Sequence, residues 1–256
     1  MGNSPINCKD PLDGSDNDIF RLIFKPELKE DGIKLISKLV RANPDILTIN
    51  ESCVGLIPDR VIKGLPLHLA IMYFEYSSFE IVKRIIELEP FSCRLSFCCS
   101  ICKKTTSPIV ALISDIHNNN KTYEILELLL TNGAKIQDSC QSALFKLFED
   151  QPITKLSIKC LQLMFQYDSF DIDQSFYRFD CSIYGCGCSK YYKLGNEGLT
   201  VLDYIKNHHS YTKYTIVAIK MIEEYCIEKY NRELEEENII DTEDIEVEHD
   251  GYLLEV

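Results

Sequence analysis

The sequence lacks several features, and each absence argues against a class of protein. No apolar run in the 256 residues approaches the roughly 18 that a membrane-spanning helix needs, so we expect no membrane span. Residues 1–20 contain no basic stretch followed by an apolar one, which argues against a secretory signal. We therefore expect reduced cysteines and a cytoplasmic or nuclear location, in the host cytoplasm if the source is a virus or a bacterium.

Motifs of the common enzyme classes are also missing. The sequence has no G-x-x-x-x-G-K-[ST] phosphate loop, no G-x-G-x-x-G after a strand pattern, no H-E-x-x-H and no G-x-S-x-G. Each of these motifs places specific chemical groups at the spacing that a reaction needs. Nothing in the sequence therefore gives a reason to expect an enzyme, and we predict no catalytic residues.

Positive charge is scarce. The chain has 27 Lys and Arg against 40 Asp and Glu, a formal net charge of −13. Residues 231–256 hold eleven acidic residues and one arginine, so they carry −10 of this charge and the other 230 residues carry −3. Because nucleic acid phosphates repel a negative protein, we expect no nucleic-acid partner.

The acidic segment 231–256 has too much like charge to fold readily alone, and we predict a disordered tail. Apolar residues interrupt the acidic ones, among them Ile239, Ile240, Tyr252 and Leu253. This alternation predicts a segment that docks on a partner, with carboxylates steering it toward a basic site.

Residues 63–90, KGLPLHLAIMYFEYSSFEIVKRIIELEP, contain two apolar helical patterns with a polar break between them. Pro66 suits the first turn of a helix, where its missing N–H is not needed. Ser78 is placed to cap a second helix, and Pro90 ends it. The stretch predicts a helix, a tight turn and a second, antiparallel helix.

The same pattern recurs along the chain. Further copies begin near Ser107, Gln141 and Glu197, and a weaker copy opens near Asp16. Four residues take equivalent positions at the start of these units, with steps of 42, 35 and 58 residues: Leu65, Ser107, Ser142 and Thr200. Gly133 is predicted to end the second helix of its unit. Helix pairs that recur at about 33 to 45 residues predict a stack of repeats.

The segments GLPLHLA and FEIVKRIIELEP resemble the ankyrin repeat, whose signature reads G-x-T-P-L-H-x-A followed by E-I-V-x-x-L-L-x-x-G-A. SPIVALI with YEILELLLTNGAKI, and EGLTVLDYI, resemble it as well. The resemblance spans residues 18–230 and implies an all-α ankyrin-repeat solenoid of about five helix-turn-helix repeats, after a flexible segment 1–17. The chain departs from the signature at Leu65, where Thr is usual. His68 keeps the motif histidine, whose hydrogen bonds hold neighbouring repeats together in the family.

The resemblance implies a binding face made of the first helices and the loops before them. The exposed positions that match are Met72, Tyr73, Ser114, Asp115, Glu149, Asp150, Asn207 and His208. Met and Tyr supply apolar contact area, and the three carboxylates favour a basic, partly apolar protein partner. The expected function is a non-catalytic scaffold, adaptor or inhibitor. Richness in Ile, Lys, Asn and Tyr resembles ankyrin proteins of large DNA viruses, intracellular bacteria or protists, which often engage host proteins.

Two cysteine clusters interrupt the repeat pattern. The first holds Cys93, Cys98, Cys99 and Cys102, and the second holds Cys181, Cys186 and Cys188. Zinc needs four thiolate or imidazole ligands, so the second cluster would need a further one such as His208 or His209. Reduced thiols packed in the insertions, a zinc site, redox sensing and palmitoylation all remain open. A metal- or redox-responsive switch is therefore the alternative function, whereas Cys160 is predicted in the core.

Overall fold

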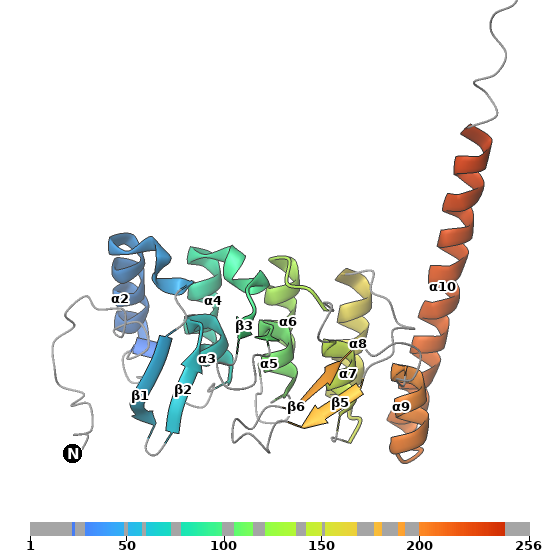
Figure 1. The fold of residues 1–256 in the computed structure, drawn as a ribbon, viewed down its shortest axis with the longest axis horizontal. Coiled ribbons are helices and arrows are strands. Elements are labelled where there is room, and N and C mark those ends of the chain that lie inside the picture. Colours follow the sequence, from blue (N-terminus) through green and yellow to red (C-terminus); the bar gives the residue numbers. More distant parts are fainter. Residues whose placement is uncertain are drawn as a thin grey trace, which may run out of the picture.

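The computed structural model describes residues 22–23, 29–48, 51–57, 60–72, 78–98, 105–114, 121–136, 142–149, 152–167, 177–180, 189–192 and 200–243. Helices dominate these ranges, which confirms the predicted all-α class. They stand side by side in a row of helix pairs (Figure 1). The expected flexible segment 1–17 lies outside the described residues.

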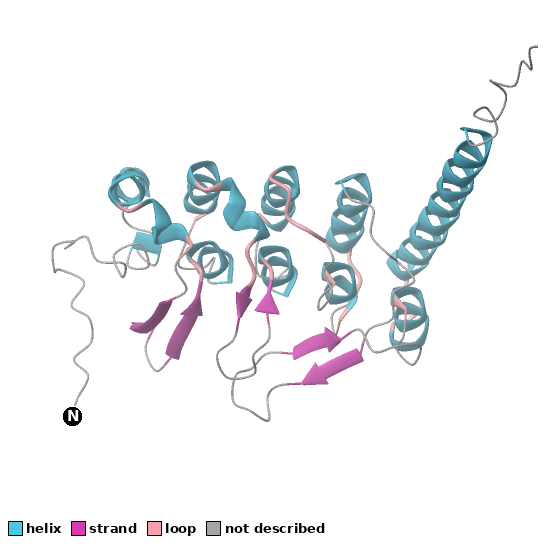
Figure 2. Ribbon diagram, turned by 45° about the horizontal axis from the view of Figure 1, so that its top comes forward, coloured by secondary structure: helices cyan, strands magenta, loops and turns pink. Residues whose placement is uncertain are grey.

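The helices form two layers (Figure 2). The short-helix layer holds α3 (Pro66–Met72), α5 (Pro108–Ser114), α7 (Ala143–Phe148) and α9 (Val201–His208). The long-helix layer holds α2 (Lys29–Ala42), α4 (Phe79–Leu88), α6 (Thr122–Thr131), α8 (Lys155–Tyr167) and α10 (Lys213–Glu243). Within each layer, every helix contacts the next one along the row. The 3₁₀ helices η2 (Pro44–Leu47) and η3 (Pro90–Arg94) follow α2 and α4.

The short helices begin where the repeated pattern predicts. The residues immediately before them are Leu65, Ser107, Ser142 and Thr200. The Ser142 hydroxyl accepts a hydrogen bond from the backbone N–H of Phe145 at 3.2 Å, and the Thr200 hydroxyl accepts one from Asp203 at 3.1 Å. Each bond satisfies a backbone donor that the first helical turn leaves unpaired. Leu65 has no hydroxyl with which to do so.

The long helices show the predicted start and stop residues. The Ser78 hydroxyl accepts a hydrogen bond from the N–H of Ile81 at 3.3 Å and caps α4. After α6, Gly133 adopts φ +80°, and the N–H of Ala134 returns to the carbonyl oxygen of Leu129 at 3.0 Å. This left-handed position favours glycine because a side chain there would clash with the backbone.

One continuous apolar core lies between the two layers. Its largest fully buried side chains are Phe145 and Phe148 of α7. The Phe145 ring lies 5.6 Å from that of Tyr204, centre to centre, and so joins α7 to α9. Cys160 of α8 is fully buried in this core, as the sequence predicts.

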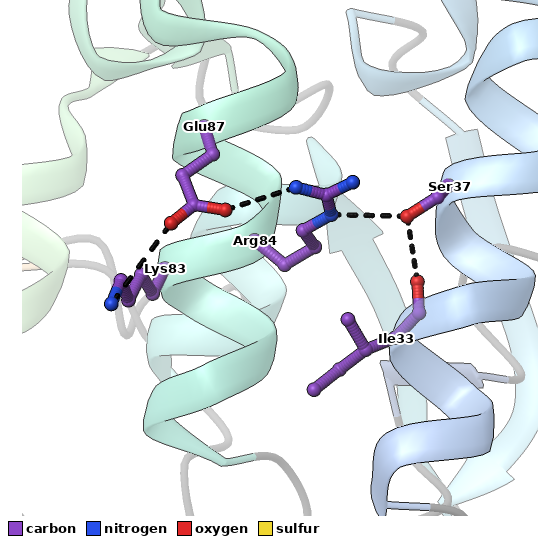
Figure 3. A network of polar contacts seen from close by, with 5 residues as sticks. All are labelled: Ile33, Ser37, Lys83, Arg84 and Glu87. Carbon is purple, nitrogen blue, oxygen red and sulfur yellow. Dashed lines mark hydrogen bonds and ion pairs between the residues drawn. The ribbon is translucent and has the colours of Figure 1, made fainter.

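Polar contacts also join neighbouring helix pairs. The Nε of Arg84 on α4 donates a hydrogen bond to the Ser37 hydroxyl on α2 at 3.0 Å (Figure 3). That hydroxyl donates in turn to the carbonyl oxygen of Ile33 at 2.9 Å, and Arg84 also pairs with Glu87 at 3.0 Å. The contact is specific because the Ser37 oxygen both accepts and donates.

Within the described ranges, three antiparallel two-stranded hairpins lie between the helices, and the sequence analysis did not anticipate them. They pair β1 (Glu51–Ile57) with β2 (Arg60–Gly64), β3 (Phe97–Cys98) with β4 (Thr105–Thr106), and β5 (Tyr177–Asp180) with β6 (Ser189–Tyr192). The two longest steps between equivalent positions, before Ser107 and before Thr200, each contain one hairpin. In Figure 2 the hairpins extend beyond the short-helix layer, away from the long-helix layer.

The predicted boundary of a disordered tail at residue 231 is wrong, because α10 continues without a break to Glu243. Glu, Leu and Arg, which make up seven of the thirteen residues 231–243, have high helix propensity. Lys229 and Glu233 add an ion pair at 3.7 Å one turn apart. The first half of α10 is packed on α8 and α9, so the costly first turn is already formed and the helix propagates. Figure 1 shows this end projecting past the other helices, and residues 244–256 lie outside the described residues.

Candidate protein-interaction surface

The last turns of α3, α5, α7 and α9 form one edge of the short-helix layer, here called the C-terminal edge. Met72 ends α3 with 41% of its surface exposed, and Ser114 ends α5 and is exposed. Asn207 and His208, in the last turn of α9, are exposed as well. The structure therefore brings these four predicted residues to one edge of the row.

The other predicted residues of this face do not add to it. Tyr73, Asp115 and Asp150 lie outside the described residues. Glu149 was predicted to be exposed, and this is wrong, because only 2% of its surface is accessible. α7 ends at Phe148, one residue earlier, so Glu149 caps the helix and its carboxylate forms an ion pair with Lys146 in the last turn. Its charge is thus compensated inside the layer and does not attract a basic partner.

A hollow of about 360 Å³ lies where the C-terminal edge meets the turn between α9 and α10. Its lining includes Pro152, Ile153, Tyr204, His208, His209, Ser210, Thr212 and Thr215. The imidazole of His208 stacks on the Tyr204 ring at 4.4 Å, and its Nδ1–H donates to the Tyr204 carbonyl oxygen at 3.1 Å. The Nε2–H of His209 donates to the Phe148 carbonyl oxygen at 2.6 Å. Both histidines are held in place by backbone oxygens, so the hollow offers a fixed aromatic and hydroxyl-lined surface.

The histidine of the repeat motif, His68, has a structural position. It is fully buried in α3, and its Nε2–H donates to the carbonyl oxygen of Thr106 in β4 at 2.7 Å. Burial disfavours the charged imidazolium and lowers the pKa of His68 to about 4, against the raising effect of the Thr106 hydrogen bond. The side chain is therefore neutral at physiological pH and joins its own helix pair to the next one, as the resemblance implies.

The cysteines predicted to hold metal, Cys181, Cys186 and Cys188, lie outside the described residues. They belong to the stretch between β5 and β6, whose facing end residues are Asp180 and Ser189. Among the residues that the structure describes, no three His, Cys, Asp or Glu side chains lie together as a metal site requires. The zinc hypothesis thus stays a prediction.

Cys93 of the first cluster belongs to the core and not to an exposed insertion. It lies in η3 with 1% of its surface accessible. Burial raises the pKa of the Cys93 thiol to about 12, in spite of the lowering contributions of Ser92 and Arg94. A thiol with this pKa carries almost no thiolate, the form that reacts with oxidants and binds metals. Cys99 and Cys102 lie outside the described residues.

The sequence analysis missed a groove between α8 and α10, with a volume of about 740 Å³. Its floor includes Phe165 and Tyr225, whose rings stack at 4.3 Å, and Met221. Its rim includes Gln162, Gln166, Glu224, Glu228, Asn231 and Arg232. The helical period of apolar residues in 213–230 is the sequence signal that could have indicated this groove. The sequence analysis ended the helix at residue 230, whereas Asn231 and Arg232 also line the groove.

Within the described ranges, no helix combines the length and the apolar character that crossing a membrane requires. No protein-family model, curated protein or solved structure matches this chain.

Proposed function

We propose that the chain is a non-catalytic protein-interaction module of the ankyrin type, which acts as a scaffold, adaptor or inhibitor. The observation that carries the proposal is the row of short helices that begin at equivalent residues, three of which, α3, α5 and α9, end in exposed residues. Such a row presents an extended surface, on which several separate helix ends can contact one partner.

The chemistry of the C-terminal edge suits a protein ligand. Met72 provides exposed apolar area, and Asn207 and His208 provide hydrogen-bonding groups at the other end of the row. Apolar contact area and hydrogen-bonding groups are both typical of protein interfaces. With Glu149 buried, the described part of this edge favours a partly apolar partner without a strong preference for basic charge.

The motif histidine gives separate support for the ankyrin type. His68 is fully buried and bonds to Thr106 of the following unit, which is the part that the resemblance assigns to this position. The His68 side chain therefore has a structural role, because it is inaccessible to solvent and bonded to the backbone of the next unit.

Site-specific photo-cross-linking tests the proposed surface. A photoreactive residue at Met72 or Asn207 would be compared with one at Lys83 or Glu127, which are exposed on the long-helix layer. We expect the first two positions to cross-link to a common protein in cells of the native source, identified by mass spectrometry. Cross-linking from the long-helix layer with none from the C-terminal edge would refute the assignment of the surface.

A further inference from the structure

The groove between α8 and α10 lies where the two helices part. α8 ends at Tyr167, whereas α10 continues to Glu243 and leans away from α8 toward that end (Figure 1, Figure 2). The groove, about 740 Å³ in volume, opens between the last turns of α8 and residues 221–232 of α10. Its described lining residues all belong to these two long helices, so it is separate from the C-terminal edge.

Three kinds of side chain line this groove, and each has a definite binding chemistry. The floor is aromatic, because the half-buried Phe165 ring stacks on that of Tyr225 at 4.3 Å, centre to centre. The α10 wall carries the exposed carboxylates of Glu224 and Glu228, one turn apart. The α8 wall carries two glutamine side chains, also one turn apart.

The charges of the groove favour a positively charged ligand. Among the described residues, neither the Glu224 nor the Glu228 carboxylate has an ion-pair or hydrogen-bond partner. Arg232 is the one basic residue in the described lining, and exposed Lys220 is not part of it. The groove also adjoins the C-terminal end of α8, where the helix dipole places partial negative charge. Two carboxylates and this helix end outweigh one guanidinium.

The preceding junction of the long-helix layer shows how the chain balances a carboxylate by itself. Between α6 and α8, a hydrogen bond from Lys121 lowers the pKa of Glu124, and the charge of Lys159 on α8 contributes. At the junction of α8 with α10, none of the described side chains does this for Glu224 or Glu228. A ligand can therefore supply the positive charge there.

A guanidinium group suits this groove better than an ammonium group. It is flat, so it stacks on an aromatic ring, and its five N–H groups reach carboxylate and amide oxygens at once. The chain uses the same group between α2 and α4. There Arg84 donates to the Ser37 hydroxyl and to the Glu87 carboxylate, each at 3.0 Å (Figure 3).

The spacing of the two carboxylates indicates the form of the ligand. Glu224 and Glu228 are four residues apart on a helix, which corresponds to about 6 Å along its axis. In an extended segment, alternate side chains point to the same side and are about 6.6 Å apart. Two arginines separated by one residue can therefore meet both carboxylates.

Other occupants fit less well. An apolar helix would bury both carboxylates without a partner, which is costly. Residues 244–256 of the chain itself hold five acidic residues and no Lys or Arg, so the same carboxylates repel them. Nucleic acid phosphates would be repelled as well.

We propose that the groove between α8 and α10 binds an extended segment of a partner protein that carries two arginines separated by one residue. The guanidinium groups pair with Glu224 and Glu228, and one of them stacks on the Phe165 ring. Gln162 and Gln166 accept further N–H groups from the α8 side. This binding does not depend on the function proposed above for the C-terminal edge.

Labelled peptides test this chemistry on the full chain by fluorescence anisotropy. Three peptides share the sequence Ser-X-Ser-X-Ser, in which X is arginine, lysine or citrulline, an uncharged analogue with the shape of arginine. At about 150 mM NaCl, which screens distant charges, we expect the arginine peptide to bind with a Kd on the order of 100 μM. The lysine peptide should bind several-fold more weakly and the citrulline peptide at least tenfold more weakly.

Variants then locate the site on the protein. Glu224→Gln with Glu228→Gln keeps the shape of both side chains and is expected to weaken binding of the arginine peptide at least tenfold. Glu80→Gln with Glu127→Gln removes the same charge at exposed residues of α4 and α6, and should leave the Kd unchanged. Phe165→Leu is expected to reduce the preference for arginine over lysine. Circular dichroism checks that each variant folds.

Four results would overturn the proposal. The arginine peptide fails to bind the full chain, or it binds the Glu224→Gln, Glu228→Gln variant as tightly as the wild type. Equal weakening by the pair Glu80→Gln, Glu127→Gln would mean that the charge of the whole chain attracts the peptide. Equal binding of the lysine or the citrulline peptide would remove the argument for a guanidinium group.

Discussion

The His68 imidazole and the Thr106 carbonyl oxygen meet at 2.7 Å across the boundary between two consecutive helix pairs. The donor comes from α3 and the acceptor from β4, the strand that leads into α5. A neutral, buried side chain thereby satisfies a backbone acceptor that belongs to another unit. The bond fixes how α5 sits against α3, because the imidazole is rigid and has no solvent around it.

The burial of His68 makes the stability of the protein depend on pH. Burial lowers the pKa of His68 to about 4 from an ordinary 6.5, so the folded state binds its proton less readily than the unfolded state. The stabilisation is complete above pH 6.5 and decreases as the pH falls toward 4, by about 3 kcal/mol in total. Urea unfolding of the wild type and of His68→Gln between pH 7.5 and 4.5 measures it. We expect the unfolding free energy of the wild type to approach that of His68→Gln as the pH falls. If the two free energies instead change in parallel with pH, His68 is not the group responsible.

Gly133 is expected to be intolerant of a side chain. A Cβ at this residue would lie 2.5 Å from Nη2 of Arg94, and its φ of +80° is unfavourable for other residues. Gly133→Ala should lower the unfolding free energy by about 1–3 kcal/mol. In Arg94→Ala the clash is absent and only the backbone conformation opposes alanine. The double variant Gly133→Ala, Arg94→Ala should therefore lose less unfolding free energy than the sum of the losses in the two single variants. Losses that add up strictly would show that Arg94 does not restrict this position.

Two adjacent basic residues on α4 should differ in importance. Arg84 donates to Ser37 of α2, whereas Lys83 reaches only Glu87 on its own helix at 4.0 Å. Arg84→Ala should lower the unfolding free energy by roughly 1 kcal/mol, because it removes a hydrogen bond between helix pairs and leaves Ser37 with one partner fewer. Lys83→Ala should change it by less than about 0.5 kcal/mol. Equal effects in thermal or urea unfolding would mean that the contact in Figure 3 does not stabilise the fold.

Cys93 and Cys160 should resist alkylation in the folded protein. Both are buried, and burial raises the pKa of each thiol to about 12. Half-buried Cys226 provides the internal comparison. Brief iodoacetamide treatment at pH 8 followed by peptide mass spectrometry should label Cys226 ahead of the other two, which react fully only in urea. Rapid labelling of Cys93 in the native state would restore it as a candidate redox sensor.

The helix starts were predictable because they depend on short-range chemistry. Pro66, Ser78 and Gly133 act within one turn of their own position, and the sequence shows them directly. The same holds for the apolar period that places Cys160 in the core. The bond from His68 to Thr106 was predictable only through the family resemblance, since it spans 38 residues.

The features that the sequence analysis missed depend on the residue at which a helix ends and on the segments that pack against that helix. Glu149 is buried because α7 stops at Phe148, whereas the local signal for a helix end, Pro152, lies four residues further along. Residues 231–243 are helical because a packed segment precedes them, although their charge alone predicts disorder. The exposure of Met72 and Asn207, in contrast, followed from the repeat pattern.

The row of helix pairs also has a mechanical consequence. Each helix has its main contacts within its own pair and with the pair on either side, so a force applied to the two ends of the chain is passed from one interface to the next. Under such tension, the protein is expected to lengthen in steps of one helix pair, starting at α10, whose outer side meets no further helix among the described residues. The assembly would then act as a spring with graded extension.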